Sequence, residues 1–169
     1  VEHLSNLARQ YRAILISALS HRLDGTAPAE DDLLDRLSTE LQKITQLLGV
    51  ENWDAALLAA QTLLKTTEPG SYDRAYTQLL IAQVHLSQSQ KAKGDFAAAI
   101  PALEAVIQSG YFEPERTLEF KYILAQLCAG EEKLDLAEKY IREWLSETDK
   151  PTAEAYVILA TLMVQRAQA

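Results

Sequence analysis

The chain has 169 residues, of which 48% are apolar, so it is long enough to bury the core of one domain. Its 16 basic and 24 acidic side chains leave a net charge of -8. Because DNA and RNA binding needs a basic face, we expect no nucleic-acid partner. No stretch approaches the roughly 18 uninterrupted apolar residues of a transmembrane helix, so we also expect no direct membrane span.

Apolar residues recur at helical spacing along the chain, and all 6 glycines fall where that spacing breaks. Glycine adopts the left-handed conformation that ends many helices, so these positions mark helix ends and turns. Eight helices are predicted, over residues 1–23, 29–48, 52–66, 71–92, 95–109, 113–129, 133–147 and 151–167. Because β-branched and aromatic residues do not alternate over a useful length, no strand is predicted and the fold class is all-α.

Polar residues and one proline refine the predicted helix boundaries. Asn52, Ser71 and Asp95 each precede an apolar or aromatic residue and can accept hydrogen bonds from the first free amides, as N-caps do. Pro101 lies six residues into the predicted fifth helix, where it lacks the amide that an interior residue donates. A kink is expected at that point.

Three segments of the chain repeat one pattern: ENWDAALLAAQTLL (51–64), GDFAAAIPALEAVI (94–107) and EKLDLAEKYIREWL (132–145). Each has a large apolar residue followed by an alanine three positions later. These positions are Trp53 and Ala56, Phe96 and Ala99, and Leu134 and Ala137. The preceding helices match at Ile44, Ala82, Ala125 and Ala160. Large and small residues on one helical stripe indicate helices that pack closely in pairs.

This pattern resembles the tetratricopeptide repeat over roughly residues 33–167, although the copies here are longer than the family's repeat of about 34 residues. The resemblance implies a right-handed solenoid of about eight antiparallel helices, with a groove lined by the first helix of each pair. It predicts a single repeat domain over residues 1–169. In that domain residues 1–28 form an N-terminal capping helix, and residues 29–169 form the repeats, the last of them incomplete.

The predicted first helix has a wide apolar stripe that must be covered. Capping of the solenoid is the leading interpretation. The alternatives are a homodimer contact through this helix and packing against a region upstream.

A narrower resemblance is to bacterial tetratricopeptide proteins that accompany TonB energy-transduction systems. It lies in ERTLEFKYILAQL (115–127), EKYIREWL (138–145) and PTAEAYVILATLMVQ (151–165). It implies a periplasmic protein near an inner-membrane complex. Without that resemblance the expected compartment is the cytoplasm.

The repeat register predicts which residues line a partner-binding groove. They are Tyr76, Leu79, Gln83, Glu119, Tyr122, Gln126, Glu154, Val157 and Thr161. Tyrosines and amides beside aliphatic residues suit an extended or helical segment of a partner protein or peptide. In the chaperone-binding branch of the family, Lys and Asn hold a terminal carboxylate. Glutamine, tyrosine and threonine occupy those positions here, so binding of heat-shock-protein tails is not expected.

No arrangement of residues in the sequence indicates catalysis. Cys128 has no histidine nearby in the sequence and falls where the register faces a neighbouring helix, so we expect it to pack in the core. His3, His21 and His85 lack the spacing of metal ligands. We therefore expect no metal, no cofactor and no enzymatic activity.

These observations favour a non-enzymatic scaffold that binds a partner protein or peptide through the solenoid groove, in a bacterial envelope TonB-type complex if the narrower resemblance holds. The alternative is a sensor or interaction segment of a larger transcriptional or signalling regulator. The two hypotheses share the same fold and differ in what else belongs to the protein.

Overall fold

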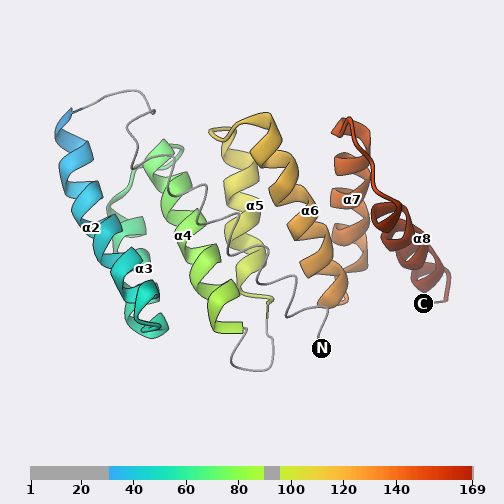
Figure 1. The fold of residues 1–169 in the computed structure, drawn as a ribbon, viewed down its shortest axis with the longest axis horizontal. Coiled ribbons are helices and arrows are strands. Elements are labelled where there is room, and N and C mark those ends of the chain that lie inside the picture. Colours follow the sequence, from blue (N-terminus) through green and yellow to red (C-terminus); the bar gives the residue numbers. More distant parts are fainter. Residues whose placement is uncertain (1–30, 90–95, 169) are drawn as a thin grey trace. The chain divides into compact units, whose positions relative to one another are not determined.

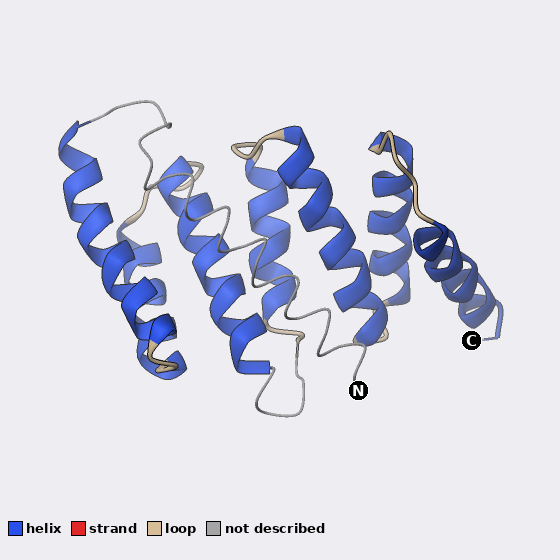
Figure 2. Ribbon diagram, viewed as in Figure 1, coloured by secondary structure: helices blue, strands red, loops and turns tan. Residues whose placement is uncertain are grey.

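The computed structural model describes residues 31–89 and 96–168, with side chains for residues 39–88 and 96–168. This part of the chain forms seven helices and no strand (Figures 1 and 2). The helices are α2 (Asp31–Gly49), α3 (Trp53–Thr66), α4 (Tyr72–Ser89), α5 (Ala99–Ser109), α6 (Pro114–Gly130), α7 (Leu134–Glu147) and α8 (Ala153–Gln168). The all-α prediction is confirmed for these residues. The predicted capping helix, and with it the predicted homodimer contact, lies outside them.

The helices belong to two compact units, Val1–Tyr111 and Phe112–Ala169. In the first unit, α4 packs against α3 and α5, while α2 packs against α3 and also touches α4. In the second unit, α7 packs against both α6 and α8. Helices that follow one another in sequence are therefore neighbours within each unit (Figure 1). The single repeat domain over residues 1–169 stays a prediction. No helix within 31–89 or 96–168 combines the length and apolar content that crossing a bilayer requires.

The small residues that mark the repeat lie in the helix contacts. Ala56, Ala99 and Ala137 are fully buried in α3, α5 and α7. Ile44, Ala82 and Ala125 are fully buried in α2, α4 and α6. An alanine without exposed surface indicates that the neighbouring helix approaches closely, because protein interiors leave few voids. Ala160 is exposed, since α8 buries only Ala155 and Leu162.

Side chains cap two helices as the sequence predicts. The side-chain oxygen of Asn52 accepts a hydrogen bond from the amide of Ala55 at 3.4 Å. The hydroxyl of Ser71 accepts one from the amide of Arg74 at 3.1 Å. Both bonds satisfy amides that have no partner inside their helix. The third predicted N-cap, Asp95, lies outside the described residues.

Left-handed residues end or precede several helices, and two of them are not glycine. Gly70 and Gly110 have φ angles of 76° and 69°, as the role predicted for the glycines requires. Glu51 and Glu132 have φ angles of 59° and 57°. They lie two residues before the first residues of α3 and α7. The third copy of the repeat has Gly94 at this position in the sequence. Alignment of the three repeat segments therefore points to this position, whereas a search for glycines finds it only in the segment with Gly94.

Pro101 lies in the first turn of α5 and not in its interior, so the argument for a kink at this residue does not apply. Helix α5 begins at Ala99, so Pro101 is its third residue. The predicted start at residue 95 was too early, because Phe96 lies in the turn before the helix, where its carbonyl accepts from the amide of Ala99 at 3.0 Å. Amides of the first helical turn have no carbonyl partner inside the helix, so a proline there forfeits no hydrogen bond.

Candidate functional site

In the second unit, the predicted groove residues lie on α6 and α8. On each helix their spacing is i, i+3, i+7, so they share one face of the helix. Glu119, Tyr122 and Gln126 lie on α6, and Glu154, Val157 and Thr161 lie on α8. Tyr122 is half-buried and Gln126 is buried, while the other four are exposed. We call these six residues the second-unit face.

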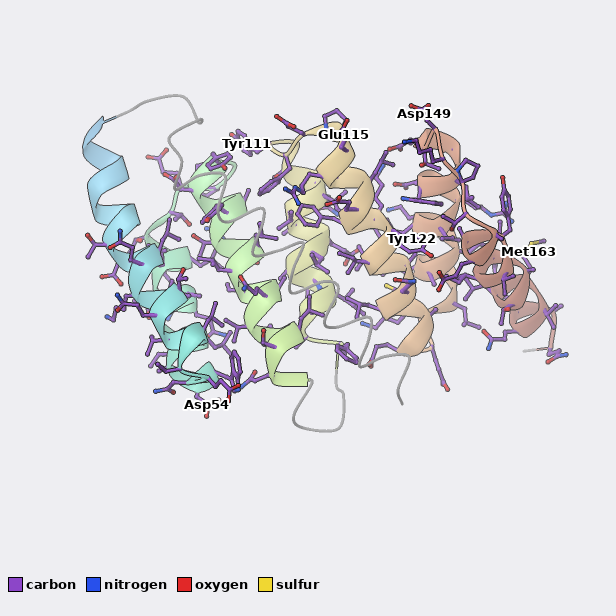
Figure 3. The ribbon with its side chains drawn as sticks, viewed as in Figure 1. Asp54, Tyr111, Glu115, Tyr122, Asp149 and Met163 are labelled. Carbon is purple, nitrogen blue, oxygen red and sulfur yellow. The ribbon has the colours of Figure 1, made fainter. Side chains whose placement is uncertain are left out.

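Tyr122 connects three helical segments of the second unit. It projects from α6 toward α7 (Figure 3), where its ring lies with its centroid 4.8 Å from that of Trp144. Thr152 and Glu154 influence the ionisation of its hydroxyl. Burial raises the pKa of Tyr122, and the negative charge of Glu154 raises it further. The hydroxyl is therefore protonated at neutral pH, and two residues predicted on separate helices, Tyr122 and Glu154, are brought together.

The buried Lys121 forms an ion-pair cluster with two more exposed glutamates beside Tyr122. Its ammonium nitrogen lies 3.3 Å from Oε2 of Glu143 and 2.6 Å from Oε1 of Glu147, and its side chain is 10% exposed. Burial alone would lower the pKa of Lys121, but hydrogen bonds and charge from the two carboxylates outweigh it and raise the pKa. The cluster joins α6 to α7. Sequence reasoning missed it, although Glu143 and Glu147 are spaced i, i+4 on the facing helix.

Gln126 and its counterpart in the first unit, Gln83, are buried polar residues. They are 8% and 5% exposed. The Oε1 atom of each has no hydrogen-bond partner. A buried polar atom usually has such a partner, so each of these two needs an explanation.

In the first unit, the predicted residues Tyr76, Leu79 and Gln83 lie on one face of α4 and are all buried. Leu79 has no exposed surface and packs in the core. Its role in a groove, like that of Tyr76, stays a prediction.

A cluster of three tyrosines lies near the start of α4. Tyr72 stacks on Tyr76 with ring centroids 6.2 Å apart and meets Tyr111 edge to face at 5.7 Å. The hydroxyl of Tyr111 donates a hydrogen bond to the carbonyl of Gly70. Sequence reasoning did not single out Tyr72 or Tyr111. Tyr111 follows the end of α5, outside any helix, so no helical periodicity relates it to α4.

Several large apolar side chains of α8 are exposed. Tyr156, Val157, Met163 and Val164 are between 52% and 63% exposed, and Met163 projects from the helix in Figure 3. Helix α8 is tied to α7 by Arg166, which pairs with Glu138 and lies 3.1 Å from Asp135, and Arg142 of α7 donates to the sulfur of Met163 at 3.8 Å. Hydrogen bonds from Arg166 and Arg142 lower the pKa of Glu138.

The described residues contain no group of three or more His, Cys, Asp or Glu side chains that could hold a metal ion. Cys128 is fully buried in α6, which confirms the packing role predicted for it. His85 is half-buried in α4, and His3 and His21 lie outside the described residues.

No protein-family model matches this chain, and neither a curated protein nor a solved structure matches it. The resemblances to tetratricopeptide and TonB-associated proteins therefore rest on the sequence pattern alone.

Proposed function

We propose that this chain is a non-enzymatic scaffold that binds a partner protein or peptide along the first helix of each helical pair. In this proposal the helices continue as a right-handed, tetratricopeptide-like solenoid whose groove contains the predicted residues. The observation that carries it is the convergence of Tyr122 and Glu154. These residues come from α6 and α8, and the negative charge of Glu154 acts on the hydroxyl of Tyr122.

The composition of the second-unit face supports a protein or peptide as the partner. Val157 is 63% exposed and lies between Glu154 and Thr161 on the same face of α8. Tyr122 adds a half-buried aromatic ring whose position is held by Trp144. An apolar centre with polar groups around it is typical of protein interfaces, and a tyrosine held in place loses little conformational entropy on binding.

The narrower resemblance makes a bacterial envelope complex the first setting in which to look for the partner. A TonB-type inner-membrane complex is the candidate. The cytoplasm is the second setting.

The test is capture of partner proteins from the source cells on immobilised wild-type chain and on two variants. Val157→Arg places a bulky cation on the second-unit face, while Ser146→Arg makes the same change at an exposed position of α7. Both variants should melt at the wild-type temperature, because both side chains are exposed. A partner bound by wild type and Ser146→Arg should lose at least about ten-fold in affinity for Val157→Arg. Equal binding by all three chains would place the interface elsewhere.

A further inference from the structure

Met163 is the one methionine of the chain, and its sulfur lies at the contact between α7 and α8. The residue is 52% exposed, so a small oxidant in solution can reach the thioether. The chain has one other sulfur atom, that of Cys128, which has no exposed surface. Two-electron oxidants convert an accessible methionine to its sulfoxide. Met163 is therefore the sulfur that such an oxidant reaches in the folded protein.

Arg142 directs a hydrogen-bond donor at this sulfur. Its Nη2 lies 3.8 Å from Sδ of Met163. Glu138 orients the guanidinium, because it accepts from Nε at 2.9 Å and lies 2.7 Å from Nη2. Glu138 also pairs with Arg166 of α8. Since Nη2 has two hydrogens, one serves Glu138 while the other is directed at Met163. A thioether sulfur is a weak acceptor, so this second contact contributes little in the reduced protein.

The distance between Arg142 and Met163 suits an oxygen atom bound to the sulfur. An S–O bond of about 1.5 Å and an N–H···O hydrogen bond of about 2.9 Å, meeting at about 120°, separate nitrogen from sulfur by about 3.9 Å. The separation in the structure is 3.8 Å. A sulfoxide oxygen on this side of the sulfur therefore accepts from Arg142 with both groups in their present positions. Hydrogen bonds from a charged donor are among the stronger ones in proteins.

We propose that Met163 is an oxidation site for hydroperoxides, and that its sulfoxide strengthens the contact of α8 with α7 through Arg142. The thioether sulfur attacks one oxygen of the hydroperoxide, an S–O bond forms and the O–O bond breaks. The sulfur is oxidised by two electrons, which reduce the peroxide. The proton of the transferred oxygen passes to the other oxygen, which leaves as an alcohol, or as water from hydrogen peroxide.

The expected effect on stability is opposite in sign to the usual one. Methionine oxidation usually disrupts a core, because a polar oxygen enters an apolar contact. About half of Met163 faces solvent, so its oxygen keeps much of its hydration. The hydrogen bond from Arg142 is then a gain, and the oxidised protein should release α8 less often. Met163 is not part of the second-unit face, so this inference does not depend on the proposed function.

The test applies dilute hydrogen peroxide to the full chain. Mass spectrometry of its peptides locates the added oxygen, and hydrogen exchange compares α8 before and after oxidation. Met163→Gln places a carbonyl oxygen near the position of the sulfoxide oxygen without any oxidant, and Met163→Leu is the matched control without one. Arg142→Leu removes the donor at a side chain that is 51% exposed.

Met163 should gain one oxygen while Cys128 stays unmodified. Amides of α8 should then exchange about five-fold more slowly, as expected for one additional hydrogen bond. Without peroxide, Met163→Gln should show the same slowing relative to Met163→Leu. Arg142→Leu should be oxidised to the same extent, and its α8 should exchange at one rate before and after the treatment.

Four results would overturn the inference. They are oxidation of Cys128 ahead of Met163, unchanged or faster exchange of α8 in the oxidised wild type, the same slowing in Arg142→Leu, and equal exchange in Met163→Gln and Met163→Leu. The proposed function is judged separately through Val157→Arg, which leaves Met163 and Arg142 in place. Either proposal can therefore fail while the other stands.

Discussion

Glu132 occupies a backbone conformation that a glycine adopts without strain. Its φ angle is 57°, and the same holds for Glu51 at 59°. A non-glycine residue in this region destabilises the folded state by on the order of 1–2 kcal/mol. Replacement by glycine recovers only part of this energy, because glycine also gives the unfolded chain more conformational freedom. The left-handed conformation of Glu51 and Glu132 therefore costs the folded chain stability that a glycine at either position would partly restore.

We expect Glu132→Gly to raise the free energy of unfolding by about 0.5 kcal/mol, the balance of these two effects. Urea unfolding followed by circular dichroism measures the change. The matched control is Lys133→Gly, because Lys133 has an ordinary φ angle of -84°. That control should destabilise the chain, and a loss of stability in both variants would contradict the strain argument.

At the scale of the element, the contact between α6 and α7 depends on the protonation of two neighbouring residues. Folding raises the pKa of Lys121 through its ion pairs and the pKa of Tyr122 through burial, with Glu154 adding to the second. A raised pKa means that the folded state holds its proton more tightly than the unfolded state. The resulting stabilisation is complete below the unfolded pKa values and is lost as the pH rises through the folded ones.

We therefore expect the free energy of unfolding to fall as the pH rises above about 10, where unfolded Tyr and Lys begin to lose protons. Urea unfolding between about pH 8 and pH 11.5 measures the profile. In Lys121→Met the alkaline fall should be smaller, because the contribution of Lys121 has been removed. Identical profiles for the two proteins would show that the ion pairs of Lys121 do not stabilise the fold.

The helices themselves follow closely from the sequence, whereas some of their details do not. Apolar spacing and turn residues predicted α2 to α8, and the caps at Asn52 and Ser71 are confirmed. The start of α5 was predicted too early. A proline such as Pro101 is compatible with the first turn of a helix although it disrupts the interior, so it gave no reason to move the start. Single-helix patterns are local, so they predict where a helix runs better than the residue at which it begins.

The candidate site was less predictable, because burial and pairing depend on neighbouring helices. The register assigned Tyr122 and Glu154 to a partner-binding groove, which stays a prediction; the structure adds that the negative charge of Glu154 acts on the hydroxyl of Tyr122. It did not predict that Gln83 and Gln126 are buried. Residue spacing shows which side chains share a face of a helix, but it does not show which neighbouring helix covers that face. The cluster around Lys121 was missed for the same reason, as it requires the register of α7 against α6.

At the scale of the whole molecule, the division into two units predicts which helices a destabilising substitution affects. Ala99 and Ala137 are fully buried in the first and second units. Replacing either by tryptophan should overpack a helix contact and cost about 1–3 kcal/mol. Repeat-like arrays transmit such changes mainly to their neighbours, so each effect should concentrate in one unit.

Hydrogen exchange read by mass spectrometry measures this division. Ala99→Trp should accelerate exchange chiefly in α2 to α5, and Ala137→Trp chiefly in α6 to α8. Ala98→Trp is the control, because Ala98 is exposed just before α5, and it should leave exchange unchanged. Uniform acceleration over the whole chain by either buried substitution would show that the two units unfold as one.

The burial of Cys128 gives the molecule a built-in reporter of its own opening. It is the only thiol of the chain, and it has no exposed surface in α6. An alkylating reagent can modify it only after α6 has moved away from its neighbours, so the rate of modification in native buffer reflects how often this helix is released. Occupation of the adjoining face by a ligand would slow that chemistry, and binding can therefore be followed without attaching a label.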